Sequence, residues 1–193
     1  MPETETMTTA AASAVNPAPL GLCAFALTTF VLSAANAKLF DGESIVIGLA
    51  LFYGGLAQLL AGMWEFKVAN TFGATAFTSY GAFWIALGAS IQMKWIPPPP
   101  SHGIAFFLLG WTIFTLILFL ATFRATLGLM LLFGFLLVTF LLLTLHAFGF
   151  GDGFGVAGGY FGLATALIAW YNAAAGLLVA TRSGLVLPVG PRS

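Results

Sequence analysis

Long apolar runs separated by short polar breaks dominate the hydrophobic pattern of the chain. Six such runs lie at 18–38, 44–64, 71–93, 103–123, 125–147 and 155–180. Each is close to the roughly 20 apolar residues that a helix needs to cross the hydrocarbon core of a bilayer. The pattern predicts an all-α integral membrane protein with six transmembrane helices.

The breaks between the runs carry residues that end helices. "KLFDGES" and "EFKVAN" hold charges, "KWIPPPPSHG" holds four prolines, and "GFGDGFG" supplies the last turn. Arg124 alone divides a long apolar stretch, which predicts a tight hairpin there. No room remains for a soluble domain. We therefore expect one membrane domain, 16–181, between a disordered polar tail, 1–15, and a short C-terminal tail, 182–193.

Composition strengthens this interpretation. The chain is 60% hydrophobic and 6% charged, with a mean hydropathy of +1.03, whereas soluble domains run near 25% charged. A net charge of zero without a basic cluster argues against a nucleic-acid partner. Cys23 is a single cysteine, and His102 and His146 lie far apart, so we predict no disulfide framework, metal site or cofactor. No nucleophile, base and orienting group occur together, so an enzyme is the least favoured class.

The basic residues suggest an orientation. An even number of spans puts both termini on one side, and a cytoplasmic N-terminus agrees with the positive-inside rule. The short loops suit the cytoplasmic (inner) membrane of a prokaryote. In this orientation four basic residues are cytoplasmic and two are external: Lys67, Arg124, Arg182 and Arg192 against Lys38 and Lys94.

Small residues recur every seven positions in two of the runs, and in an α-helix this spacing returns to the same face. Small residues let helices approach closely in lipid. We therefore predict tight helix packing, with some of the interfaces between subunits. The two series are Gly48, Gly55 and Gly62 in the second run and Ala74, Gly81 and Gly88 in the third.

Polar side chains form a stripe on each run. Interhelical hydrogen bonding explains any single stripe, but the stripes together are typical of the lining of a narrow path. Phe25 and Tyr80 adjoin them as candidate apolar gates. The stripes include Thr29, Ser33 and Asn36 in the first run, Gln58 and Glu65 in the second, Thr71, Thr75 and Thr78 in the third, and Thr139 and His146 in the fifth.

The stretch "NPAPLGL", Asn16–Leu22, opens the first run with two prolines. One interpretation is a sharp helix start, with Asn16 as the cap and Pro17 at the first helical position. In this interpretation Ala18, which precedes Pro19, is pushed away from helical geometry. The other interpretation is an unwound segment whose free backbone groups face a polar solute.

Charge is absent from the centres of the spans. Glu65, the carboxylate at a membrane edge, is explained by an interfacial position beside Lys67, and a lone His146 is a weak candidate for titration. The path therefore suits a small solute that meets hydroxyls, amides and helix ends. It suits neither a metal ion nor a multiply charged substrate.

These motifs resemble those of the acetate uptake transporter (YaaH / acetate–succinate permease) family. The resemblance is carried by "NPAPLGL", "FALTTF" and the block "FYGGLAQLLAGMWEFKVANTFGATAFTSYGAFW", and it covers all six runs as far as "LPVG". It implies a six-helix protomer similar to the acid-activated urea channels, assembled in the lipid bilayer as a homo-hexamer with one path per protomer. It implies passage of acetate, with succinate or other short monocarboxylates, by a channel or a proton symporter.

The resemblance also maps individual residues. It implies an apolar constriction at Phe25, Tyr80 and Leu136. Neither His146 nor the loop Pro97–Pro100 matches a family pattern. The signature residues that map directly are Asn16, Pro17, Pro19, Gly21, Gln58, Glu65, Asn70 and Thr71.

A transport hypothesis follows from these residues. A helix N-terminus attracts an anion without a fixed cation, so we expect Asn16 and the backbone around Leu20, Gly21 and Leu22 to meet the carboxylate at the cytoplasmic entrance. An apolar neck favours a neutral acid over an ion. Glu65 and His146 are the candidate proton-linked groups. The side chains expected to pass the solute onward are Thr28, Thr29, Gln58, Asn70, Thr71, Thr75 and Thr78.

Two other classes remain open. The uncharged stripes fit a channel for urea or short amides equally well, and only the family motifs favour carboxylates. A membrane scaffold without transport would explain the glycines, but it does not need polar stripes on six spans.

Overall fold

The computed structural model describes residues 15–42, 44–96 and 100–190. Among these residues the regular structure is helical throughout, and the helices follow the six apolar runs of the sequence. The predicted tail 1–15 lies outside the described residues except for Val15. The helices are α1 (Ala18–Asn36), α2 (Ser44–Gly48), the π-helix η1 (Leu49–Ala57), α3 (Gln58–Lys67), α4 (Thr71–Gln92), α5 (His102–Ala121), the 3₁₀ turn η2 (Thr122–Arg124), α6 (Leu127–Ala147) and α7 (Asp152–Ala180).

Helix length and composition agree with a membrane protein. Five helical segments of the described chain are long and apolar enough to cross a bilayer: α1, the continuous α2–η1–α3, α5 with η2, α6 and α7. The remaining long helix, α4, has 22 residues but carries threonine, serine and glycine along its length. The predicted all-α membrane class is confirmed.

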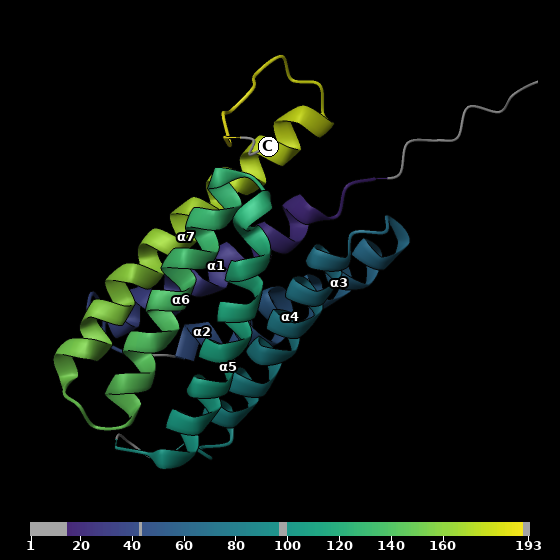
Figure 1. Ribbon diagram of the computed structural model, residues 1–193. Helices are drawn as coiled ribbons and strands as arrows, with labels where there is room; N and C mark the ends of the chain where they lie inside the picture. The colour runs from purple at the N-terminus through teal and green to yellow at the C-terminus, as the bar shows by residue number, and fades with distance from the viewer. Residues whose placement is uncertain (1–14, 43, 97–99, 191–193) are drawn as a thin grey trace, which may run out of the picture.

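The helices form a closed ring. α1 packs against α7, α7 against α6 and α6 against α5, while α3 and η1 join α4 to α1. The contact between α4 and α5 is sparse and closes the ring. α1 begins and α7 ends at the same end of the bundle, here called the terminal end (Figure 1). The opposite end is called the far end.

The turns agree with the helix-ending residues. The hairpin predicted at Arg124 is the short η2 turn between α5 and α6. The C-terminal segment folds back onto the start of α6, where the Leu127 and Gly128 N–H groups donate to the Gly190 and Val189 carbonyls at 2.7 and 2.9 Å. These bonds satisfy N–H groups that a helix start leaves free.

The opening motif is a sharp helix start. The Asn16 Oδ1 accepts a hydrogen bond from the Ala18 N–H at 3.0 Å, but the N-cap is Pro17, one residue later than predicted, and α1 runs from Ala18 to Asn36 without interruption. The expectation that Ala18 leaves helical geometry is wrong, because Ala18 is the first helical residue. Pro19 then occupies the first turn, where its missing N–H costs no hydrogen bond.

The glycine pattern needs one correction. Gly62 and Gly55 press against α4 as predicted, but Gly48 has open space where a Cβ would lie. Seven-residue spacing marks one face only in a regular α-helix. The π-helix between Gly48 and Gln58 changes the number of residues per turn, so Gly48 turns away from the face of the other two.

Candidate functional site

Among the cavities of the described residues, two lie one above the other along α1 inside the ring. The upper chamber, nearer the terminal end, has a volume of about 110 Å³, and the lower chamber has a volume of about 30 Å³. By this measure a water molecule needs roughly 10–15 Å³. The upper chamber therefore has room for a small organic solute, and the lower one for a few atoms at a time.

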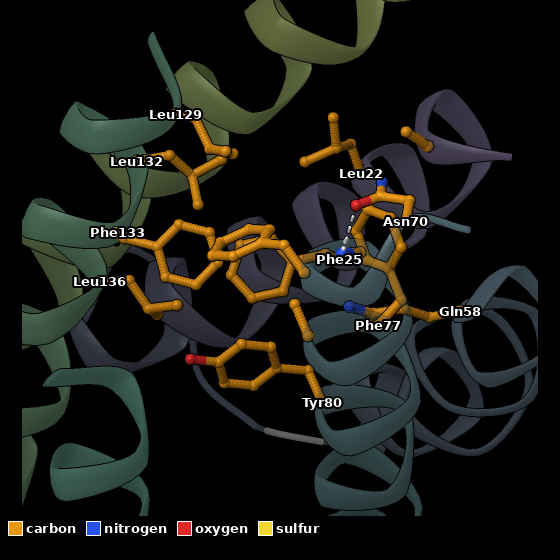
Figure 2. A pocket seen from close by; sticks show the side chains of 14 residues that line it. Leu22, Phe25, Gln58, Asn70, Phe77, Tyr80, Leu129, Leu132, Phe133 and Leu136 are labelled. Carbon is orange, nitrogen blue, oxygen red and sulfur yellow. Dashed lines mark hydrogen bonds between the residues drawn. The ribbon is translucent and has the colours of Figure 1, made fainter. Parts of the chain in front are cut away.

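The walls of the upper chamber are mostly apolar. Leu22 of α1, Phe77 of α4 and Leu132 and Phe133 of α6 face one another across it (Figure 2). Gln58, at the start of α3, and Asn70, which precedes α4, supply amides. Asn70 is itself exposed and lies in the short turn between α3 and α4. Because this turn is at the terminal end of the bundle (Figure 1), the chamber lies near that end.

The Gln58 side chain is the distinctive polar group of this chamber. It is 0% exposed, and neither its Nε2 nor its Oε1 has a hydrogen-bond partner among the residues that the structure describes. A buried polar group without a partner costs about 1–3 kcal/mol. An unpaired amide that lines a cavity is therefore suited to bind a solute.

A neck separates the chambers. Phe25 and Leu136 line both of them, and Tyr80 lines the upper one. The Phe25 and Tyr80 ring centroids lie 5.8 Å apart, and all three side chains are buried. These are the three residues that the family resemblance assigns to a constriction.

Hydrogen bonding directs the Tyr80 hydroxyl away from the chambers. It lies 2.8 Å from the Thr115 Oγ1 of α5. Thr115 donates its own hydrogen to the Trp111 carbonyl at 2.7 Å, so Tyr80 is the donor to Thr115. The Tyr80 hydroxyl is thereby paired with α5, and the neck is lined by the ring and is apolar.

The lower chamber carries more polar groups. Thr29, Ser33 and Asn36, the predicted stripe of the first run, all line it, as does Thr139 of α6. The Thr29 Oγ1 and the Trp84 Nε1 are buried without a hydrogen-bond partner in the described part of the chain. A solute that passes the neck therefore meets new hydrogen-bonding groups beyond it.

Glu65 and Asn70 form a linked pair at the terminal end. Glu65 is 1% exposed, and its Oε2 accepts from the Asn70 Nδ2 at 2.8 Å. The Asn70 Oδ1 accepts from the Gly73 N–H at 3.1 Å and caps α4. The Glu65 Oε1 has no partner within residues 15–42, 44–96 and 100–190. Glu65, which was expected at a membrane edge beside Lys67, is thus buried against Asn70 near the end of α3.

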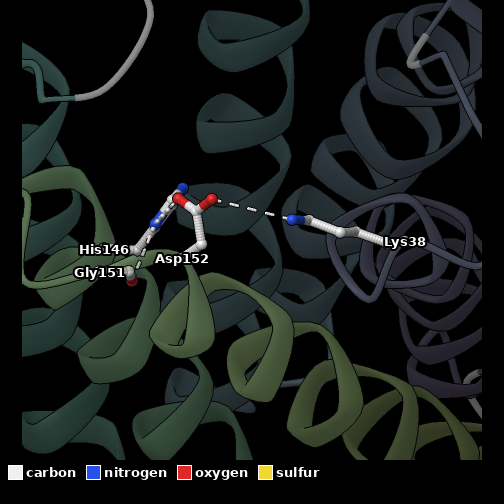
Figure 3. Close-up of polar contacts among 4 residues, drawn as sticks. All are labelled: Lys38, His146, Gly151 and Asp152. Atoms are coloured by element: carbon white, nitrogen blue, oxygen red, sulfur yellow. Dashed lines mark hydrogen bonds and ion pairs between the residues drawn. The ribbon is translucent and has the colours of Figure 1, made fainter.

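His146 lies in the last turn of α6, at the far end of the bundle. Gln58 lines the upper chamber, nearer the terminal end. The His146 Nδ1 is 3.9 Å from the Asp152 Oδ1, and the Asp152 Oδ2 is 3.9 Å from the Lys38 Nζ (Figure 3). The same Nδ1 is 3.3 Å from the Gly151 carbonyl. Lys38 and Asp152 are largely exposed, and exposed pairs contribute little stability.

Several predicted path residues lie away from the chambers. Thr28 is fully buried and donates to the Ala24 carbonyl at 3.0 Å, and Thr78 packs against Gly62. Neither lines a chamber. The remaining predicted residues outside the linings are Asn16, Leu20, Thr71 and Thr75, which are exposed, Pro17, which is half-buried, and Pro19 and Gly21, which are buried.

Sequence reasoning missed six aromatic residues of the linings. The upper chamber is lined by Phe72, Phe77 and Phe133, and the lower one by Phe83, Trp84 and Phe140. Trp84 is 3% exposed, within the core of the bundle. A search for polar stripes does not find apolar lining residues, because they look like ordinary core residues in a sequence this hydrophobic.

A ring of membrane helices around a narrow, largely apolar passage defines a membrane channel or transporter for a small solute. The chain belongs to the GPR1/FUN34/yaaH family, whose sequence profile matches residues 2–192. The predicted family is confirmed.

Relatives with assigned names support this membership. The chain is 47% identical over 194 residues to acetate permease A of Emericella nidulans, which covers 90% of the chain and 65% of the permease. It is 48% identical over 173 residues to accumulation of dyads protein 2 of Saccharomyces cerevisiae, covering 84% and 61%. The chain thus spans less than two thirds of the length of these fungal relatives.

A bacterial relative matches over nearly its whole length. The succinate-acetate/proton symporter SatP of Escherichia coli K12 is 37% identical over 178 residues, covering 91% of the chain and 95% of SatP. The solved structure of the bacterial acetate channel SatP superposes with a TM-score of 0.86 at 37% identity, covering 91% of the chain and 99% of that structure. The helical arrangement is therefore that of SatP, and the chain is a multi-pass membrane protein.

Proposed function

We propose that the protein carries acetate and related short carboxylates, succinate included, across a membrane through the two chambers. Relatives named acetate permease, succinate-acetate/proton symporter and acetate channel support this substrate class. The path has uncharged walls, so binding is weak enough for release, as permeation requires. The proposal includes six membrane crossings with both termini in the cytoplasm of a prokaryotic cell.

The unpaired Gln58 amide carries the proposal. Gln58 belongs to the lining of the upper chamber, neither of its amide atoms has a hydrogen-bond partner in the described chain, and an amide can both donate and accept. A carboxylic acid has the complementary pair, an O–H donor and a carbonyl acceptor, so the two groups can form two hydrogen bonds. A carboxylate has only acceptors and can pair with the Nε2 alone. Gln58 therefore favours the protonated solute.

The neck also favours the protonated form of the solute. Phe25, Tyr80 and Leu136 offer a solute no charge and no free hydrogen-bonding group, and an unpaired ion is far more costly than a neutral molecule in such surroundings. A carboxyl with a pKa near 4.3 is protonated in only about one molecule in 500 at pH 7. Transport should therefore rise steeply as the pH falls.

Glu65 and His146 are the proposed proton-linked groups of the protein. Glu65 is the stronger candidate, because its buried Oε1 has no partner in the described chain and its Oε2 bonds Asn70, a residue of the upper chamber. His146 lies beside Asp152 and Lys38 at the far end. It suits a role at the far mouth of the path.

A homo-hexamer in the bilayer is the proposed assembly. Large apolar side chains on the outer surfaces of several helices are exposed in the single chain, among them Phe52, Phe106, Ile117 and Leu167. Lipid tails or neighbouring protomers would cover them. The likeness to the SatP channel supports the same packing of each protomer.

Competition between solutes tests the function directly. Purified protein in liposomes with an inward pH gradient is expected to take up labelled acetate faster than empty liposomes do, and excess unlabelled acetate should suppress the signal. Urea also carries an N–H donor beside a carbonyl acceptor and can pair with Gln58, but its protonation does not change between pH 5 and pH 8, so only acetate uptake is expected to accelerate with acid. Equal competition by urea, with no acceleration by acid, would support a neutral-solute channel instead.

A further inference from the structure

The second membrane-spanning helix departs from α-helical geometry immediately before Gln58. The nine residues Leu49–Ala57 form a π-helix, in which N–H groups bond to carbonyls five residues back and each turn holds more residues. The π-type bonding reaches Gln58, whose backbone N–H bonds to the Tyr53 carbonyl. The segment thus ends at the residue that supplies the chamber with its amide.

Beyond the π-helix, the register against α4 is that of two regular antiparallel helices. Leu59 lies against Gly81, and Gly62 lies against Thr78. The three residue steps from Leu59 to Gly62 are therefore opposite the three steps from Gly81 to Thr78. The contact between α3 and α4 is therefore compatible with two regular α-helices.

Across the π-helix the register differs. Ala50 lies against Gly88, so the nine residue steps from Ala50 to Leu59 are opposite only seven steps, from Gly88 to Gly81. At an α-helical rise of about 1.5 Å per residue, nine residues would extend about 3 Å further than seven. The π-helix takes up this excess, because it places more residues in each turn.

The extra residues also determine where Gln58 points. Each residue of an α-helix turns the chain by about 100°. Nine α-helical residues in place of this segment would turn Gln58 through a large angle relative to Ala50, or would displace the contact between Leu59 and Gly81. The amide lies in the chamber because the segment is wound as a π-helix.

Gly55 is the residue that this geometry requires. A Cβ at this position would clash with the carbonyl oxygen of Ala50, which is five residues back in the same π-helix, and would lie 2.7 Å from the Ile85 Cγ1 of α4. The side chain of Ile85 can move, but the Ala50 carbonyl is part of the backbone. Any larger residue therefore opposes the π-helical winding.

We propose that Gly55 and the π-helix η1 position Gln58 for the solute, so that Gly55 is a positioning residue for transport. This inference depends on the proposed function of Gln58. It assigns a transport role to a glycine that touches neither chamber.

The test compares the variants Gly55→Ala and Gln58→Leu with the combination of both. Gly55→Ala is expected to lower acetate uptake to within about threefold of Gln58→Leu, and the double variant should be no lower than Gln58→Leu alone. Gly48→Ala is the matched control in the same helix, because its Cβ would enter open space, and it should retain full uptake. Additive losses in the double variant, or near-normal uptake by Gly55→Ala, would overturn the proposal.

Shortening the helix provides a rescue that a purely structural glycine would not show. Deleting Leu51 and Phe52 leaves seven residue steps between Ala50 and Leu59 opposite the seven between Gly88 and Gly81, so an α-helix should fit and keep Gln58 beside the chamber. We expect this variant to fold and transport within about threefold of the wild type, and Gly55→Ala to be harmless in it. A shortened chain that fails to fold, or one still impaired by Gly55→Ala, contradicts the register argument.

Cross-linking measures the register between the π-helix and α4 without a transport assay. In a Cys23→Ala background, the pair Ala50→Cys and Gly88→Cys should form a disulfide, and Gly55→Ala should abolish it. Thermal unfolding of each variant in detergent shows whether Gly55→Ala leaves the rest of the fold intact. An unchanged disulfide refutes the inference even if the protein carries no acetate, whereas absent uptake with the expected cross-linking refutes only the proposed function.

Discussion

Replacing Gln58 with leucine is expected to lower acetate uptake by about 10- to 100-fold. The carboxyl group would enter a buried apolar chamber without its partner, at a cost of about 1–3 kcal/mol, and each 1.4 kcal/mol corresponds to about tenfold. Thermal stability should not fall, because the substitution removes a buried amide that has no partner in the described structure and replaces it with an apolar group of similar size. Uptake into liposomes and thermal unfolding in detergent measure the two effects.

A matched variant separates this effect from general damage. Thr122→Val removes a fully buried hydroxyl that donates to the Phe119 carbonyl at 2.6 Å, away from both chambers. It should reduce stability slightly and leave uptake near the wild-type rate. If Gln58→Leu transports normally, or loses stability and uptake together, the amide is not the solute's partner.

Replacing Phe25 with alanine is expected to remove the selectivity of the neck. Phe25 lines both chambers, so its truncation would join them into one wetter passage. Uptake at neutral pH should rise by about tenfold, its acceleration by acid should weaken, and larger monocarboxylates should pass. The reason is that a hydrated passage no longer excludes the anion. Labelled uptake between pH 5 and pH 8, for acids of increasing chain length, measures all three effects.

Phe30→Ala is the control on the same helix. Phe30 packs against Trp170 with ring centroids 5.3 Å apart and lines neither chamber. Phe25→Ala should lower stability by a few kcal/mol, as phenylalanine truncations in packed interiors do, and Phe30→Ala by less, because Phe30 is only half-buried. Only Phe25→Ala should alter the pH profile. A Phe25→Ala protein with lower uptake and an unchanged pH profile would show that the ring supports the fold and not the neck.

Much of the fold could be predicted from apolar run lengths and breaks. A helix across a bilayer must satisfy its backbone internally, so length and hydropathy identify spans directly, and Arg124 and the glycine-rich turn divided the runs where the helices divide. The π-helix could not be predicted. It arises from packing against α4, which the sequence of Leu49–Ala57 does not reveal.

The candidate site was predictable only in part. Gln58 and the stripe of Thr29, Ser33 and Asn36 do line the chambers, because polar groups in lipid turn inward. Thr28 and Thr78 are equally polar, but they pack against Gly54 and Gly62 at helix contacts. Composition cannot separate these two uses of a threonine.

The most direct test of the central claim measures what crosses the neck. Proteoliposomes loaded with a pH-sensitive dye, with the membrane potential set by a potassium gradient and valinomycin, receive labelled acetate, and Gln58→Leu liposomes provide the background. We predict uptake that is independent of the potential and accompanied by one proton per acetate, because the neutral acid passes Phe25, Tyr80 and Leu136. Uptake that follows the potential without internal acidification would show that the anion passes, and would contradict the account.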